Sequence, residues 1–337
     1  MSIADQAPQP TKAGTQEPLV ASEHDRIRLS SFLAPKYWLA WLFLGWLKLT
    51  TWLPWAFAIR LHKAIGRGIW RLLPRRRRIV ERNLELCFPE LQPSEIRDLA
   101  KRNFENIGAC MAEIAYAWLG SMEPLLPLFR IEGREHLDAA LSKGKGVIVL
   151  SGHFSTLEIC VPLLRSLVPF FAFMFSPRRN GLLNAAQIMG RRKAAHASFS
   201  NSDVRTMIRM LRKNAVVWYA PDQARSGNSG TLLDFFGEPA MTNTAASRLA
   251  RASGATVVPL FFCRLPDESG YVLRFEAPLD NMPSADVNLD TMRLIKIIEG
   301  FIRECPEQYF WIHRRFKGRP DDLPMAYRND AEPPDTA

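Results

Sequence analysis

Two spacings of apolar residues alternate through the central part of the chain. Short runs rich in β-branched and aromatic residues are typical of buried strands, and stretches with apolar residues every three to four positions are typical of helices. Strands are predicted at 146–150, 170–175, 215–220, 256–262 and 271–276, and helices between the first four at 155–165, 182–196, 203–213 and 243–252. This alternation predicts an α/β fold with a mainly parallel central sheet flanked by helices.

An apolar segment rich in tryptophan precedes this pattern. Its 23 residues, Tyr37 to Ile59, exceed the roughly 20 that cross a bilayer core. Six of the nine tryptophans lie between positions 38 and 70, and indole rings favour the membrane interface. Lys48 and Pro54 interrupt the segment. We therefore expect an N-terminal membrane helix, which either spans the bilayer once or lies flat in the interface as an anchor.

Basic residues follow the apolar segment. Residues 60–82 contain nine Lys or Arg, against four in residues 1–36. If the segment spans, this asymmetry places the downstream side in the cytoplasm. If the segment lies flat, the same charges bind anionic head groups. The run Arg75–Arg78 could also contact nucleic acid, but its place beside the tryptophan-rich segment favours lipid over nucleic acid.

The chain divides into four parts by composition. Residues 1–30 are polar without apolar periodicity, and we expect a disordered lead. Residues 31–82 hold the membrane anchor and the basic juxtamembrane segment, and residues 83–320 form one large domain. Residues 321–337 are rich in Pro and Asp and are predicted to be a disordered tail.

Charge, cysteine content and missing motifs limit the kinds of partner, compartment and enzyme that fit this chain. The net charge of +10 over 337 residues implies an anionic partner. The five cysteines stand far apart, with no C-x-x-C pair and no histidine at metal spacing, so we expect a reducing compartment and neither a metal nor a cofactor. The motifs G-x-S-x-G, G-x-x-x-x-G-K-[ST] and H-E-x-x-H are absent from the sequence, which argues against serine hydrolases, P-loop nucleotidases and zinc proteases.

The stretch HFSTLE, residues 153–158, carries the most specific chemistry. His153 follows the first predicted strand and Asp222 follows the third, and ligands bind at the carboxyl ends of parallel strands. An imidazole there suits general base catalysis, and Glu158, about one turn further on, could orient it and stabilise the imidazolium. The alternative is a capping box in which Ser155 and Glu158 satisfy amides at a helix start, beside an ordinary loop histidine.

Further blocks follow HFSTLE in order: FMFSPRRNG from Phe173, WYAPDQ from Trp218 and VVPLFF from Val257. Together they resemble the glycerolipid and lysophospholipid acyltransferase superfamily. The blocks MGRRK, from Met189, and PEQYFWIHRRFKGRP, from Pro306, extend the likeness. Over residues 35–320 the chain resembles the late acyltransferases of lipid A biosynthesis, the lauroyl and myristoyl transferases.

This resemblance implies a reaction and a set of site residues. The donor would be an acyl carrier protein thioester, and the acceptor the 3-hydroxyacyl hydroxyl of a phosphorylated, Kdo-bearing lipid A precursor, with a lauroyl chain favoured. His153 and Glu158 would be catalytic, and Arg191 and Asp222 would bind substrate. Since no residue has an evident acyl-enzyme role, direct transfer with His153 as base is expected. Residues 83–320 would be the acyltransferase domain, facing the cytoplasm at the bacterial inner membrane.

Two other interpretations remain open at this point. A related enzyme could acylate another membrane lipid, such as a phosphatidylinositol mannoside or an aminolipid. The chain could also be a basic membrane-binding protein without catalysis. Against the second stands the ordered presence of His153, Glu158, Asp222 and the strand that contains Pro259.

Overall fold

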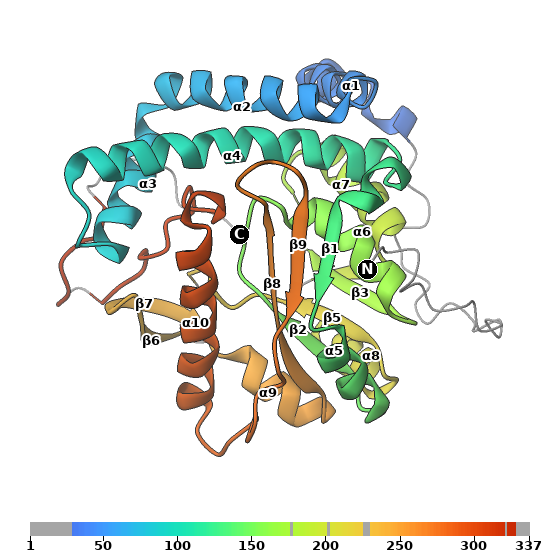
Figure 1. Ribbon diagram of the computed structural model, residues 1–337, viewed down its shortest axis with the longest axis vertical. Coiled ribbons are helices and arrows are strands. Elements are labelled where there is room, and N and C mark those ends of the chain that lie inside the picture. The colour runs from blue at the N-terminus through green and yellow to red at the C-terminus, as the bar shows by residue number, and fades with distance from the viewer. Residues whose placement is uncertain (1–28, 176–177, 201–202, 225–229, 321, 328–337) are drawn as a thin grey trace.

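A seven-stranded sheet forms the centre of the molecule (Figure 1). The computed structural model describes residues 29–175, 178–200, 203–224, 230–320 and 322–327. In spatial order the strands are β1 (Phe129–Glu132), β9 (Tyr271–Phe275), β8 (Thr256–Arg264), β2 (Val147–Leu150), β5 (Val216–Tyr219), β3 (Phe171–Phe175) and β4 (Ala197–Ser200). From β8 to β4 every pairing is parallel, whereas β9 pairs antiparallel with β8 and parallel with β1. The prediction of a mainly parallel α/β sheet is confirmed.

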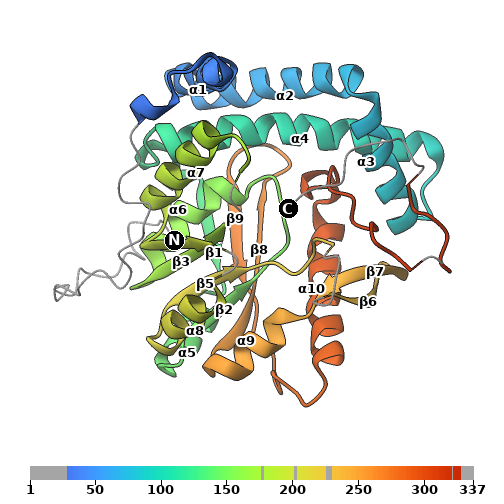
Figure 2. The ribbon, with the colours of Figure 1, turned by 180° about the vertical axis from the view of Figure 1, so that it is seen from behind.

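Helices cover both faces of this sheet, as the turned view in Figure 2 also shows. On β2, Val147 and Val149 join one apolar core, and Ile148 and Leu150 join the other, because successive side chains of a strand point to opposite faces. The first core packs against α4 (Pro93–Leu119), α6 (Leu157–Leu167) and α7 (Gly181–Ala194), and the second against α8 (Val204–Arg212) and α9 (Ala245–Ser253).

The five predicted strands and the four predicted helices are all present, with ends shifted by a few residues. The pattern missed β1 and β4, which are four residues long, only partly buried and at the edges of the sheet. It also missed an antiparallel hairpin outside the main sheet. The further elements are α5 (Arg134–Ser142), β6 (Gly230–Phe235), β7 (Glu238–Asn243), α10 (Val287–Glu304) and short 3-10 helices at Leu29–Phe32, Pro35–Tyr37, Glu123–Leu128 and Pro306–Gln308.

The apolar N-terminal segment is broken into two helices, so the prediction of one continuous membrane helix is wrong. The chain forms α1 (Trp38–Thr50), turns, and resumes as α2 (Trp55–Leu72) and α3 (Pro74–Cys87). Pro54 explains the break, because proline lacks a backbone N–H and clashes with the preceding helical turn. Among the residues that the structure describes, no helix has both the length and the hydropathy needed to cross a bilayer. The predicted lead and tail lie mostly outside those residues.

The N-terminal helices pack on α4 through two glycines. A Cβ added to Gly66 of α2 would lie 2.2 Å from the carbonyl oxygen of Phe104, and one added to Gly108 of α4 would lie 2.1 Å from that of His62. Both obstacles are backbone atoms, which cannot rotate away. The close approach of α2 to α4 therefore requires glycine at both positions.

This crossing predicts opposite effects for two neighbouring glycines. We expect Gly66→Ala to lower the free energy of unfolding by roughly 1 to 3 kcal/mol, because α2 must move away from α4. Gly68, in the same helix, has open space around its Cα, and Gly68→Ala should be neutral or stabilising by up to about 1 kcal/mol. Chemical denaturation of both variants measures the difference, and equal stability would contradict the packing described.

Candidate active site

The register between two neighbouring strands brings His153 and Asp222 together. Leu150 at the end of β2 pairs with Tyr219 at the end of β5, and each candidate residue comes three positions later. The imidazole Nδ1 lies 2.6 Å from Asp222 Oδ1, and the backbone N–H of His153 donates to Asp222 Oδ2 at 2.7 Å. Glycine at position 152 suits the tight packing of this loop, since a Cβ there would lie 3.1 Å from side-chain carbons of Ile298 and Phe154.

The environment keeps Asp222 ionised. Its side chain is fully buried, whereas that of His153 is 26% exposed. Burial by itself raises the pKa of a carboxyl group, but the charge and the two hydrogen bonds of His153 outweigh it and lower the pKa of Asp222 to about 2. A carboxylate at Nδ1 favours the tautomer that carries its proton there. Nε2 is thereby left as the basic nitrogen of the ring.

Glu158 has different partners from those predicted. Trp118 Nε1 donates to its Oε2 at 2.9 Å, and Arg191 Nη2 donates to its Oε1 at 2.5 Å. Within the described residues Glu158 makes no hydrogen bond to His153, so the predicted His153–Glu158 pair is wrong. Sequence distance misled because α6 carries Glu158 toward α4 and α7, whereas Asp222 arrives from the neighbouring strand.

The alternative capping box is wrong as well. Helix α6 begins at Leu157, its N-cap is Thr156, and no side chain caps it. Glu158 is therefore the second residue of the helix rather than the third, which a capping box requires. The backbone N–H of Ser155 donates instead to the carbonyl oxygen of Gln308 at 2.7 Å.

An aromatic stack connects Arg191 to His153. The Arg191 guanidinium lies 4.4 Å from the ring centre of Phe173, a cation–π contact. Phe173 stacks on Trp218 at 5.1 Å and 17°, and the Trp218 ring meets His153 at 5.4 Å and 87°. Arg191 is only 8% exposed, so it is buried. It forms the end of the stack that is farthest from His153. The Glu158–Arg191 ion pair thus reaches the histidine through two rings.

Backbone hydrogen bonds connect the C-terminal block, residues 306–320, to the loop that carries His153. Phe310 N–H donates to the carbonyl oxygen of His153 at 2.9 Å, beside the bond from Ser155 to Gln308. Asn103 of α4 fixes this block, because its Nδ2 donates to two backbone oxygens, those of Glu307 at 2.9 Å and Tyr309 at 2.7 Å. The sequence indicated mainly packing here, and it gave no sign of these backbone contacts.

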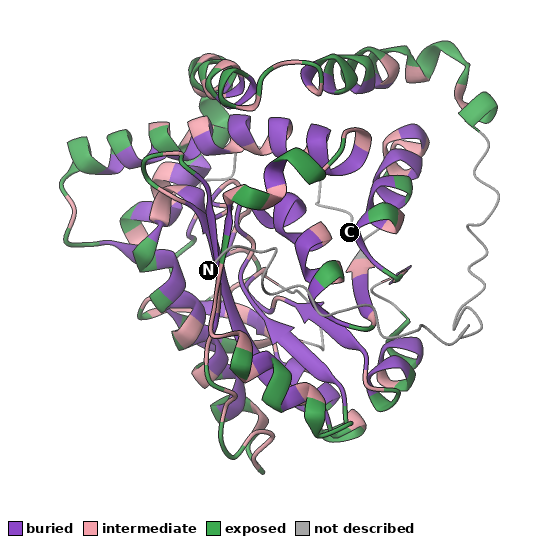
Figure 3. Ribbon diagram, turned by 45° about the vertical axis from the view of Figure 1, so that its right-hand side comes forward, coloured by how far each residue is buried: buried purple, intermediate pink, exposed green. Residues whose placement is uncertain are grey.

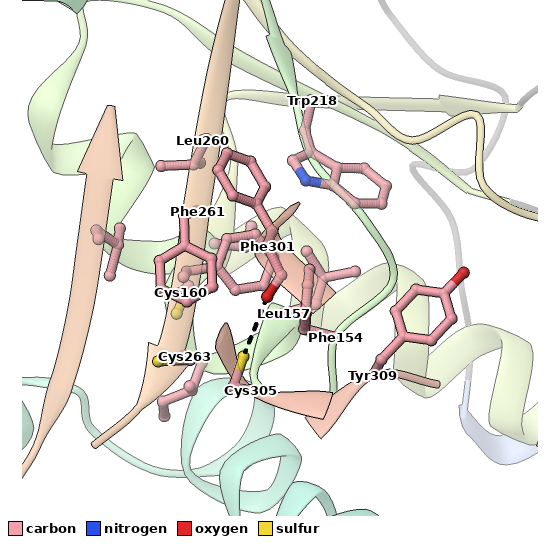
Figure 4. Close-up of a cluster of buried hydrophobic side chains, with 14 of the residues drawn as sticks. Phe154, Leu157, Cys160, Trp218, Leu260, Phe261, Cys263, Phe301, Cys305 and Tyr309 are labelled. Carbon is pink, nitrogen blue, oxygen red and sulfur yellow. Dashed lines mark hydrogen bonds between the residues drawn. The ribbon is translucent and has the colours of Figure 1, made fainter. Parts of the chain in front are cut away.

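A buried aromatic cluster lies under the same loop (Figure 4). Phe154 meets Phe262 at 5.8 Å and Tyr309 at 5.7 Å, both edge to face. Such packing fixes the residue next to His153 and limits how far the loop can move. His313, whose Nε2 accepts from the N–H of Ala224 at 3.3 Å, supports the Asp222 loop in the same way. Burial lowers the pKa of His313 to about 4, so at neutral pH it remains an acceptor.

Several buried hydrogen-bonding groups near the site have no partner among the described residues. They are Ser151 Oγ, Ser155 Oγ, Thr156 Oγ1 and Trp218 Nε1. Unpaired buried polar groups are uncommon in folded proteins, and three of these four lie within three residues of His153. The described residues contain no group of three or more His, Cys, Asp or Glu that could hold a metal ion. Arg225, downstream of Asp222, lies outside those residues.

Comparison with known proteins finds relatives over most of the chain. The family model described as bacterial lipid A biosynthesis acyltransferase matches residues 26–318. The chain is 36% identical over 299 residues to the lipid A biosynthesis lauroyltransferase of Escherichia coli K12, covering 88% of this chain and 97% of that protein. It is 34% identical over 290 residues to the palmitoleoyltransferase of the same strain, covering 86% and 94%.

More distant matches are also found. The lipid A biosynthesis myristoyltransferase of Escherichia coli K12 is 28% identical over 305 residues, covering 90% of this chain and 94% of that protein. A crystal structure of a 1-acyl-sn-glycerophosphate acyltransferase from Thermotoga maritima matches 73% of this chain and 97% of its own, at 14% identity and a TM-score of 0.36. On the family match and the identities above 30%, this chain is an acyltransferase that belongs to the bacterial lipid A biosynthesis acyltransferase family.

Proposed function

We propose that this enzyme transfers a fatty acyl chain from an acyl carrier protein thioester to the 3-hydroxyacyl hydroxyl of a phosphorylated, Kdo-bearing lipid A precursor. The observation that carries the proposal is the buried Asp222 carboxylate 2.6 Å from Nδ1 of His153, with Nε2 left to accept a proton. A lauroyl donor is favoured because a relative of 36% identity is named a lauroyltransferase.

The proposed chemistry is direct acyl transfer. His153 Nε2 takes the proton of the acceptor hydroxyl as its oxygen bonds to the thioester carbonyl carbon, and Asp222 stabilises the imidazolium. The negative charge on the carbonyl oxygen is met by the amino terminus of α6, which starts at Leu157, and by Trp218 Nε1. The carbon–sulfur bond then breaks, and the imidazolium returns its proton to the leaving thiol.

Two substitutions test the pair. His153→Ala should lower kcat by roughly 100-fold or more, as expected for the loss of a general base. Asp222→Asn should also lower kcat severely, because an amide cannot stabilise the imidazolium or fix its tautomer. Since the pKa of Asp222 is lowered to about 2, its charge does not change between pH 4 and 9. In the wild-type enzyme, protonation of Asp222 should therefore make no contribution to the kcat profile over that range.

The matched control for this pair is His136→Ala, a histidine on α5. It should retain wild-type activity, with circular dichroism confirming the fold of all three variants. Residual activity within a few-fold of wild type in both His153→Ala and Asp222→Asn, at saturating donor and acceptor, would sink the proposed mechanism.

Arg191 and Glu158 are proposed to act as positioning residues. The sequence suggested that Arg191 binds an anionic group of the acceptor, but its guanidinium is buried and paired with Glu158. Its flat contact with Phe173 continues through Trp218 to the ring of His153. Glu158 holds the guanidinium on this stack, so both residues influence the orientation of the base.

Arg191→Lys separates these roles, because lysine keeps the charge but loses the planar contact. Positioning predicts a fall in kcat of about tenfold with little change in the KM of either substrate. Direct binding of the acceptor predicts instead a raised KM for the acceptor alone. Steady-state kinetics with each substrate varied in turn distinguishes the two, and unchanged kcat and KM would exclude both.

We further propose that α1 and α2 lie in the interface of the inner membrane, leaving the catalytic domain in the cytoplasm. Figure 3 marks much of these two helices as exposed. Apolar side chains that are at least half exposed in these helices and in the turn between them are Trp38, Leu39, Leu42, Leu49, Trp52, Phe57 and Leu72. Exposed leucines and tryptophans beside a basic segment are typical of an interfacial helix bound to anionic lipids.

Vesicle binding tests this contact. The double variant Leu39→Glu and Leu42→Glu should bind vesicles containing anionic lipid at least about tenfold more weakly, since two apolar side chains no longer enter the interface. Leu289→Glu, at a half-exposed leucine of α10, is the control and should bind like wild type. Equal binding of all three proteins in a sedimentation assay would contradict the proposed orientation.

A further inference from the structure

Helices α8 and α9 lie at the end of the molecule opposite α1 and α2 (Figures 1 and 2), and a shallow basic groove lies between them. It encloses about 480 Å³ and is lined by Arg205, Ile208, Arg209, Arg212, Lys213 and Ala252. Four of these six residues are cationic, and the apolar pair forms part of the lining. Arg248 and Arg251 of α9 are also exposed.

No internal partner neutralises this charge. Arg209 bonds to Thr206 Oγ1 at 2.8 Å, and Arg212 bonds to the carbonyl oxygen of Ala252 at 2.6 Å. Asp203 caps α8, and its charge acts on Arg209. Across the described part of the chain, however, no carboxylate forms an ion pair with any of the four cations of the groove.

Three arginines of the groove share one face of α8. Arg205, Arg209 and Arg212 stand four and then three positions apart on α8, which places them on one face. Like charges at that spacing destabilise a helix. Acidic and basic side chains in alternation would keep the exposed face of α8 equally soluble. The uniform sign instead fits a surface that meets a negative partner.

We propose that this groove docks an acidic face of the acyl carrier protein that brings the donor thioester. The inference rests on the proposed function and adds to it the place where the donor binds. A membrane is the less favoured partner, because the exposed apolar residues of α1 lie at the opposite end of the molecule. A bilayer that holds those residues leaves the groove in water, where a soluble partner can reach it.

The groove runs along α8 from near the carboxyl edge of the sheet to Lys213 and Ala252, which lie close to the amino ends of β5 and β8. Helix α8 follows β4 and leads into β5, so its first residue is near the carboxyl edge of the sheet, where His153 is found. Its nine residues extend about 13 Å from that edge. A donor held on a flexible arm can therefore dock along α8 while its thioester passes over the edge to His153.

The test compares a carrier-bound donor with a small donor. With a lauroyl thioester of acyl carrier protein, Arg205→Gln combined with Arg209→Gln should raise the donor KM about tenfold at low salt. With lauroyl-pantetheine, which has no protein to dock, KM and kcat should stay at the wild-type values. Added salt should raise the wild-type KM for the carrier-bound donor only.

The control replaces two exposed arginines of α4, Arg97→Gln with Arg102→Gln, which removes the same charge elsewhere. The control should leave the KM for both donors unchanged. An equal effect on both donors, no effect on either, or a loss restricted to anionic vesicle binding would overturn the docking proposal. A wild-type enzyme that uses both donors with one KM at all salt concentrations would instead contradict the carrier protein as donor.

Discussion

The parallel pairing of β2 with β5 is the constraint on which the site depends. It aligns Leu150 with Tyr219, and equal loop lengths then place the imidazole of His153 against the carboxylate of Asp222. A shift of the register by one residue would move the two side chains apart and invert which face of the sheet each strand side chain meets. Because both strands are central and buried on both faces, the register is strongly specified.

Other parts of the structure hold this alignment rather than create it. The C-terminal block makes backbone bonds to both sides of the His153 loop, and Asn103 and Gln308 fix that block to α4 and β8. These amides satisfy backbone groups that would otherwise be buried without partners, which is costly. Loss of one of them would loosen the loop without touching the reacting atoms.

Helix α4 joins the N-terminal helices to the sheet. On one side it packs against α2 at the close approach of Gly66 and Gly108. On the other side it carries Glu113, whose carboxylate accepts hydrogen bonds from Arg264 Nη2 at 2.6 Å and from Tyr271 Oη at 2.7 Å. Glu113 and Arg264 are almost completely buried, and a buried pair of this kind is costly to break because removal of one partner leaves an unpaired charge. Helix α4 thus connects α1 and α2 firmly to the central sheet.

The sequence by itself determined five strands, including the central ones, most of the helices and the two chemical groups of the site, because apolar periodicity and strand ends are local properties. It also placed His153 and Asp222 at the same edge of the sheet, yet it paired His153 with Glu158. Distance along the sequence is a poor guide to the partner of a loop histidine, because a residue on a neighbouring strand can lie closer to it than a residue of the helix that follows. Only the tertiary structure could decide, because strand order and register determine which loops meet. The stacking of Phe173 on Trp218 likewise depends on strand order, because β3 lies next to β5. The break of the apolar segment at Pro54 could be recognised only once the separate positions of α1 and α2 were known.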